Sequence, residues 1–197
     1  MNIINNLRLL NSKERYFLFT AATDNPNLNL GQKFINEINA TIGIKIPKNH
    51  FVAIDYHLDW LYAAITVDIT SDSIEHDNPY NTMQGNQEDI DLLIAFEKED
   101  KTVIILIEAK CFGSWTNKQI NSKIDRLNLI FETKTNNIVK PYFMLMSPKE
   151  SKNLKVINGK RWFDIDGKPF WMKLNVPALK MVSRISKTNN KWKIIDR

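Results

Sequence analysis

The sequence is poor in the residues that mark several common classes of protein. Its single cysteine, Cys111, excludes an internal disulfide and suits a reducing compartment. Its three histidines form no Cys/His cluster with the spacing of a zinc site. None of its six glycines belongs to a phosphate-binding glycine-rich loop, so an ATPase or an NAD-dependent enzyme is unsupported. These absences leave carboxylates and lysines as the groups to inspect.

Long hydrophobic runs are also absent. No stretch approaches the roughly 20 apolar residues of a transmembrane helix. The first eight residues, Met-Asn-Ile-Ile-Asn-Asn-Leu-Arg, lack the continuous apolar core of a secretory signal. We therefore expect a cytoplasmic protein without a membrane segment. A length of 197 residues suits one domain, or one domain with a small appendage.

Charge is distributed unevenly along the chain. Residues 1–139 hold 13 Lys and Arg against 18 Asp and Glu, whereas residues 140–197 hold 14 against 4. A basic segment on a mildly acidic body suits a polyanionic partner, and it equally suits a solvated surface that keeps the protein in solution. We expect a core over residues 1–148, with N-terminal helices, and a basic β-rich extension over 149–197 packed on the same domain.

The two most hydrophobic segments lie close together and predict a β-hairpin. Residues 91–96 and 102–107 are rich in Ile, Leu and Val, and a run of charged residues, Glu97 to Lys101, separates them. Short apolar runs bounded by a polar turn are typical of buried strands. In an antiparallel pair the start of one strand lies beside the end of the other. Charged residues at those two positions therefore meet at one end of the sheet.

Three charged residues occupy these positions. Asp91 opens the first strand, and Glu108 and Lys110 close the second. Because side chains on a strand alternate between faces, Glu108 and Lys110 share a face and Ala109 points away. Two carboxylates suit Mg²⁺, which takes oxygen ligands, and the ammonium can hold the attacking water or offset charge on phosphorus oxygens. The alternative is an ordinary core hairpin with charged ends.

The segments Ile-Asp-Leu-Leu-Ile-Ala and Ile-Leu-Ile-Glu-Ala-Lys, joined by a short turn, resemble the motif of the PD-(D/E)XK, or restriction-endonuclease-like, nuclease superfamily. Asp91 matches the motif aspartate, Glu108 the second acidic residue and Lys110 the lysine. Ile90 replaces the motif proline, which members of the superfamily often lack. The resemblance implies an α/β fold with a central mixed β-sheet flanked by helices. It also implies a nuclease that uses Mg²⁺, with Mn²⁺ as a substitute.

The resemblance implies further residues around the motif. Superfamily members carry an acidic residue on a helix before the sheet, and Glu37, on a helix expected over 31–42, or Glu14 suits this metal-binding role. Glu37 lies closer in sequence to the predicted core strands than Glu14 does. Asp89 shares a strand face with Asp91 and is a rival ligand.

A helix expected over 118–131 follows the motif, and residues at helical spacing predict its face toward the sheet. In the superfamily this helix places a Gln or Lys near the metal or the scissile phosphate, and Gln119 and Lys123 resemble those residues. We expect Gln119 to be catalytic, and Lys123 and Arg126 to bind nucleic acid. An apolar run over 141–147 predicts a strand parallel to the one that ends in Lys110. The residues expected to face the sheet are Ile120, Ile124, Leu127 and Phe131.

The last third of the chain combines basic and aromatic residues. We expect hairpins at Asp166-Gly167 and between strands at 181–185 and 192–195. Basic groups there suit backbone phosphates and tryptophans suit base stacking, although a packed β appendage has the same composition. The basic residues assigned to nucleic acid are Lys160, Arg161 and Arg184, and the tryptophans are Trp162, Trp171 and Trp192.

Two polar segments precede the motif. Residues 51–65 fit a strand that leads into a helix, or one amphipathic helix, and carry Asp55, His57 and Asp59 among aromatic residues. We favour a half-buried helix over a metal or base site for them. Residues 70–88 are rich in turn formers and predict a loop that leads to Asp91.

Together these features predict a Mg²⁺-dependent nuclease that hydrolyses phosphodiester bonds of DNA. A homodimer fits, because two sites related by a two-fold axis cut both strands of a duplex. The alternative is a non-catalytic module that binds nucleic acid or a protein partner through the basic C-terminal segment.

Overall fold

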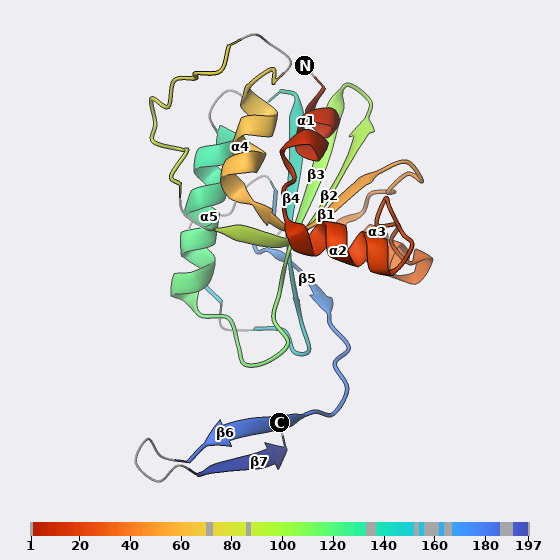
Figure 1. The fold of residues 1–197 in the computed structure, drawn as a ribbon, viewed down its shortest axis with the longest axis vertical. Coiled ribbons are helices and arrows are strands. Elements are labelled where there is room, and N and C mark those ends of the chain that lie inside the picture. Colours follow the sequence, from red (N-terminus) through yellow and green to blue (C-terminus); the bar gives the residue numbers. More distant parts are fainter. Residues whose placement is uncertain are drawn as a thin grey trace.

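Five strands form one mixed sheet in the order β1-β2-β3-β4-β5, with helices packed on both faces (Figure 1). The computed structural model describes residues 2–69, 73–85, 88–132, 137–151, 154–155, 162–163, 167–185 and 191–196. The helices are α1 (Ile3–Leu10), α2 (Glu14–Ala22), α3 (Gln32–Ile42), α4 (Leu58–Thr66) and α5 (Asn117–Glu132). The strands are β1 (Phe51–His57), β2 (Asp89–Lys98), β3 (Lys101–Ala109), β4 (Val139–Ser147), β5 (Phe170–Lys173), β6 (Lys180–Arg184) and β7 (Trp192–Asp196).

The predicted hairpin of two core strands is confirmed. β2 and β3 pair antiparallel, with Leu92 opposite Ile107 and Lys98 opposite Lys101. The chain reverses at the turn Glu99-Asp100, where Glu99 has a φ of 56°. The register follows from burial on both faces, because a slip by one residue would exchange every side chain between the faces. It places the start of β2 beside the end of β3.

Helix α5 connects β3 to a parallel strand, as predicted. Thr116 caps this helix, since its hydroxyl accepts the backbone N–H of Gln119. β4 pairs parallel with β3, and β5 pairs parallel with β4. The sheet therefore extends beyond residue 148, where we expected the core to end.

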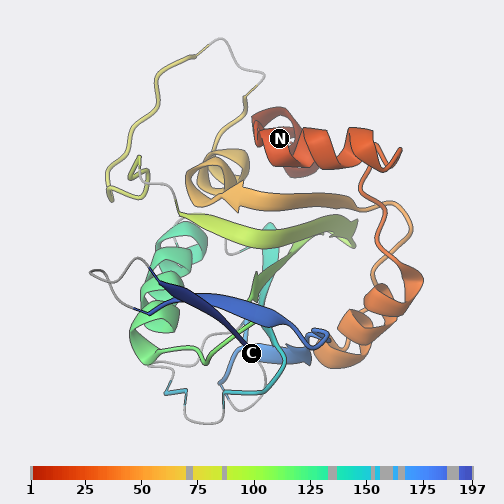
Figure 2. The same cartoon turned by 60° about the horizontal axis from the view of Figure 1, so that its bottom comes forward.

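The two faces of the sheet carry different helices (Figure 2). Alternate residues of β2 and β3, such as Leu93 and Leu106, pack with α1, α4 and α5. The residues between them, such as Ile94 and Ile105, pack with α3. Both faces are apolar because both are covered. Glu108 has the same parity as Leu106 and lies on the face of α5, where it contacts Lys123. The strict alternation of β2 breaks at Asp91, because Ile90 and Leu93 on either side of it pack in the same cluster.

The C-terminal strands form a second, two-stranded sheet, as predicted. β6 and β7 pair antiparallel and stand apart from the five-stranded sheet in Figure 1. The turn expected at Asp166-Gly167 lies partly outside the described residues. Phe170–Lys173, expected as one arm of that hairpin, instead extends the main sheet through its parallel pairing with β4.

The other predicted segments also match the structure. Residues 51–65 are a strand that leads directly into a helix, the first of the two alternatives. The described part of the loop, residues 73–85 and 88, contains no helix or strand. Within the described residues no helix is long and apolar enough to cross a membrane.

A buried amide holds the N-terminal helix on the domain. Asn6 is 2% exposed, and its side-chain amide donates to the carbonyl oxygens of Ala64 and Val67 at distances of 3.0 and 2.9 Å. These carbonyls lie at the C-terminal end of α4, where helix carbonyls lack intrahelical donors. Asn6 therefore joins α1 to α4 through groups that need a donor.

We expect Asn6→Ala to lower the free energy of unfolding by about 2 kcal/mol, because it leaves buried carbonyls without a donor. Asn5→Ala removes an exposed side chain from the same helix and should change this free energy by less than about 0.5 kcal/mol. Urea denaturation of both variants measures the difference. Equal losses in the two variants would contradict the anchoring role of Asn6.

Candidate active site

The hairpin brings Asp91 and Glu108 together at one end of the sheet. The Oδ2 atom of Asp91 accepts the backbone N–H of Ala109 at 2.6 Å. This bond joins the start of β2 to the residue that follows Glu108. The two carboxylates therefore lie side by side without a turn or loop between them, and their relative position depends only on strand register.

Glu108 is the more buried of these two carboxylates. Its side chain is 16% exposed, and its Oε1 lies 3.3 Å from the Nζ of Lys123. Its Oε2 is buried and has no hydrogen-bond partner within the described residues. The pKa of Glu108 is raised to about 7, mainly by burial; the ammonium of Lys123 acts against this shift, and the charge of Asp91 adds to it. Glu108 thus holds a proton more tightly than an ordinary glutamate.

Asp91 is more open, but its surroundings also disfavour its charge. Desolvation raises its pKa, and the charges of Asp55 and Asp89 act in the same direction. The N–H of Ala109 and the charge of Lys123 lower it. Among the described residues no lysine or arginine forms an ion pair with Asp91. Asp91 is therefore the carboxylate of this group that has room for another cation.

Lys123 is an internal counter-ion at this end of the sheet. Its side chain is 11% exposed, and its ammonium donates to the backbone oxygen of Asp89 at 2.6 Å. The same ammonium lies 3.6 Å from Glu88 and 3.3 Å from Glu108. We expected Lys123 to contact nucleic acid from the helix surface. The structure instead places it below the surface, because α5 packs directly over the carboxylates.

Lys110 and Gln119 contact each other beside the carboxylates. The Nζ of Lys110 donates to the backbone oxygen of Ser114 at 2.8 Å and to the Oε1 of Gln119 at 3.4 Å. It also lies 5.1 Å from the centroid of the Trp115 ring. Gln119 is fixed in turn, since its Oε1 accepts the hydroxyl of Thr116 at 3.0 Å. The ammonium of Lys110 is therefore bound by the loop before α5 and by Gln119.

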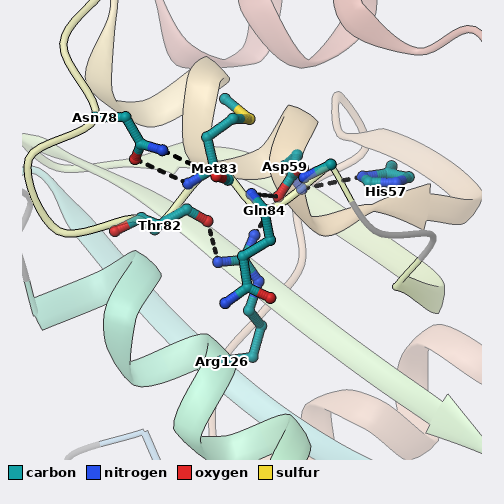
Figure 3. Close-up of polar contacts among 8 residues, drawn as sticks. His57, Asp59, Asn78, Thr82, Met83, Gln84 and Arg126 are labelled. Atoms are coloured by element: carbon teal, nitrogen blue, oxygen red, sulfur yellow. Dashed lines mark hydrogen bonds and ion pairs between the residues drawn. The ribbon is translucent and has the colours of Figure 1, made fainter.

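Arg126 lies one turn beyond Lys123 on α5 and is not available to a ligand. It is 3% exposed and donates to Asp59 on α4 and to the carbonyl oxygen of Thr82 (Figure 3). Our expectation that Arg126 binds nucleic acid is therefore wrong. Polar residues at helical spacing are usually solvated, but here α4 supplies a buried carboxylate that pairs with the guanidinium.

The Asp59–Arg126 pair also holds the loop that leads to β2. Asp59 accepts the backbone N–H groups of Gln84 at 3.3 Å and Gly85 at 2.7 Å. Figure 3 shows these residues gathered around the pair. His57 caps α4, because its Nδ1 accepts the N–H of Asp59 at 3.1 Å. Asp59 is thus a structural anchor on a helix, as we favoured for this segment, whereas Asp55 and His57 lie on β1 instead.

Asp55 is an additional carboxylate that sequence reasoning did not assign to the site. It lies near Asp91, whose pKa its charge raises, and has a φ of 50°, in the left-handed region that few residues other than glycine adopt. The residue pairs that flank this position are Ile54 with Leu92 and Tyr56 with Ile90.

Two basic residues flanking Glu14 neutralise neighbouring carboxylates. Lys13 lies 2.6 Å from the Oδ2 of Asp89, and Arg15 lies 3.0 Å from the Oδ2 of Asp55. Asp89, a rival metal ligand in the sequence, is thus already paired with a lysine. Glu14 is exposed at the start of α2. The alternation of Lys13, Glu14 and Arg15 was the signal available in the sequence for these contacts.

The remaining candidates within the described residues do not belong to this site. Glu37 lies on α3, which packs on the opposite face of the sheet from Glu108 and Lys123. Arg184 lies on β6, in the separate two-stranded sheet. Lys160 and Arg161 lie outside the described residues. Trp162, expected to stack on bases, is 1% exposed and packs in the core instead.

The donor set suits one divalent cation with an incomplete protein shell. Asp91 is open on one side, and the buried Oε2 of Glu108 lacks a partner. Mg²⁺ commonly takes one or two carboxylates and completes its shell with water and substrate oxygens. Within the described part of the chain no group of three or more His, Cys, Asp or Glu is arranged to hold a metal ion. The fit therefore rests on two carboxylates.

Comparison with known proteins adds nothing to this geometry. No protein-family model, no curated protein and no solved structure matches the chain.

We expect Arg126→Met to lower the free energy of unfolding by about 3 to 5 kcal/mol, because it leaves Asp59 buried and charged without its partner. Asp125→Asn changes the charge of an exposed neighbour on α5 and should alter this free energy by less than about 0.5 kcal/mol. Chemical denaturation measures both. An Arg126→Met variant as stable as Asp125→Asn would exclude a buried ion pair.

The raised pKa of Glu108 predicts a pH-dependent stability. Between pH 4.5, its ordinary pKa, and about 7, the folded protein holds a proton on Glu108 that the unfolded chain has released. The free energy of unfolding should therefore fall as pH rises through this window, by roughly 3 kcal/mol from Glu108. Glu108→Gln should remove this part of the fall, and Glu75→Gln, in the exposed loop, should retain it.

Denaturation in the presence of a chelator, from about pH 4 to about pH 8, tests the shift. A Glu108→Gln curve that runs parallel to the wild-type curve would show that Glu108 titrates normally.

Proposed function

We propose that the protein is a metal-dependent nuclease that hydrolyses phosphodiester bonds, with DNA as its substrate. The observation that carries this proposal is the pair Asp91 and Glu108, held together at one sheet end, with an unpartnered buried oxygen on Glu108 and Lys110 two residues further on. Lys123 offsets only part of the solvation free energy that this arrangement costs, because the pKa of Glu108 remains raised. A cation between the two carboxylates offsets that cost.

Each residue has a separate role in the proposed reaction. Asp91 and Glu108 would ligate Mg²⁺ or Mn²⁺, which lowers the pKa of bound water and neutralises charge on the phosphate when bound. Lys110 would turn from the carbonyl of Ser114 toward the attacking water or the phosphate oxygens. Its present contacts, with the carbonyl of Ser114 and with Gln119 at the start of α5, are exposed to solvent. Gln119 would hold the ammonium in place between turnovers.

The connectivity also supports a restriction-endonuclease-like fold. The aspartate opens the second strand of an antiparallel meander, and the Glu-x-Lys sequence closes the third. A helix then crosses to a parallel strand. This order agrees with the resemblance of the motif to the PD-(D/E)XK superfamily, which came from the residues alone.

A second candidate is a module that binds nucleic acid without cutting it. The observation in its favour is the β6–β7 sheet, which places Arg184 opposite Trp192 on an exposed surface. Residues 174–197 contain six basic residues and one acidic residue. A two-stranded ribbon is narrow enough for the major groove of DNA. The same sheet serves a nuclease as its substrate-binding arm.

We expect Asp91→Asn and Lys110→Ala each to reduce cleavage by about 100-fold or more, because each removes charge that acts on the transition state. Lys118→Ala removes an exposed lysine from the same helix end and should cleave like the wild type. The assay uses supercoiled plasmid, linear duplex, single-stranded DNA and RNA with Mg²⁺ or Mn²⁺. Circular dichroism should give the same spectrum for all variants.

The controls separate the two candidates. Cleavage that continues in the presence of a chelator, or in Asp91→Asn, would refute the metal-dependent mechanism at these residues. Binding of duplex DNA by every variant, without cleavage by any, would favour the binding module.

A further inference from the structure

Helix α2 is apolar on nearly every side but only partly covered. Its sequence, Glu-Arg-Tyr-Phe-Leu-Phe-Thr-Ala-Ala, has apolar residues all round the helix, a pattern typical of helices that are fully buried. Within it only Tyr16 and Thr20 are buried. Phe17, Leu18 and Phe19 remain 53%, 71% and 49% exposed, and Leu9 of α1 is 64% exposed. Four large apolar side chains thus face solvent on α1 and α2.

One of these side chains, Phe17, lines a cleft on the outer side of the domain. The cleft has a volume of about 630 Å³ and lies between α1, α2 and the start of β1. Figure 2 shows α1 and α2 along the outer side of β1, the edge strand of the sheet. Helix α2 therefore contributes one wall of the cleft and also carries Leu18, the most exposed of its large apolar side chains. The residues that line the cleft are Arg8, Asn11, Tyr16, Phe17, Thr20, Ala21, Asp24, Pro26 and Phe51.

Two opposite charges line the same cleft without pairing. The guanidinium of Arg8 lies 5.3 Å from the centroid of the Phe51 ring, and Asp24 follows the end of α2. Among the described residues neither Arg8 nor Asp24 forms an ion pair. The surface thus has one charge of each sign, and a two-fold axis would bring each charge to its opposite.

We propose that α1 and α2 form the interface of a homodimer, with a second copy of this chain covering the cleft. In a two-fold interface, residue i contacts residue j of the partner and j contacts i. The contact would pair Arg8 of each copy with Asp24 of the other and bury Phe17 and Leu18. Arg8 and Asp24 lie on the same surface, so a second copy carries both of the opposite charges that this surface needs. An unrelated partner would not have to carry them. The proposal does not depend on nuclease activity.

Analytical ultracentrifugation of the full chain, over a series of concentrations, measures the association. We expect the wild type to sediment as a dimer. Leu18→Asp introduces a charge at an exposed position and should raise the dimer Kd by about tenfold or more. Ile74→Asp makes the same change at a residue that is 92% exposed in the loop after α4, and should leave the Kd unchanged.

Charge reversal tests the pairing itself. Arg8→Glu alone and Asp24→Lys alone should each raise the dimer Kd by about tenfold or more, since each places like charges opposite one another. The double variant Arg8→Glu/Asp24→Lys restores opposite charges in a homodimer and should bring the Kd back toward the wild-type value. Circular dichroism and thermal melting accompany each variant, because Asp24 has a φ of 49° that disfavours lysine.

Three results would overturn the proposal. The first is a wild type that sediments as a monomer at every concentration. This holds even if its α1–α2 surface binds a different protein. The second is a dimer that tolerates Leu18→Asp as well as Ile74→Asp. The third is a double variant that folds but associates no better than the two single variants.

Discussion

The ammonium of Lys123 is the charge on which the end of the sheet depends. Strand register brings Asp91 and Glu108 together, and Asp89 and Glu88 lie beside them on the same strand or just before it. So much negative charge at a covered position would be unstable without a cation. Lys123 supplies one from α5, within 3.6 Å of two carboxylates and one backbone oxygen. It lowers the pKa of Glu108 without cancelling the effect of burial.

Helix α5 performs two tasks with residues three positions apart. Lys123 balances the carboxylates of β2 and β3, and Arg126 binds Asp59 of α4 and the loop that leads to β2. Both side chains lie on the side of the helix that faces the domain. A substitution that moves α5 would therefore disturb the charge of Glu108 and the position of the loop together. Helix α5 supplies no metal ligand in our proposal, but the site still depends on it because Lys123 and Arg126 both lie on it.

The sequence was sufficient for the β2–β3 hairpin, for the carboxylates at its end and for the parallel strand β4, because these follow from short apolar runs and a crossover helix. It was not sufficient for β5, which was expected in a separate hairpin and instead pairs with β4. The roles of Lys123 and Arg126 were not accessible, because helical spacing identifies a polar side but not a buried partner on another element. Asp59 is 67 residues from Arg126 in sequence. The orientation of Lys110 depends on the torsions of a long, flexible side chain. Glu37 lies on α3, and the side of the sheet on which a helix packs cannot be read from its sequence.

The position of Lys123 on α5 also bears on the order in which the protein folds. The contacts of β1, β2 and β3 join segments that follow one another in sequence, apart from one long loop, whereas β4 pairs with β3 only after the crossover helix has been laid down. An early meander would therefore place Asp91 and Glu108 next to each other before Lys123 arrives. Docking of α5 relieves this repulsion. The residues best suited to chemistry in the finished protein thus oppose the first steps of its assembly, and the helix that follows them in the chain compensates.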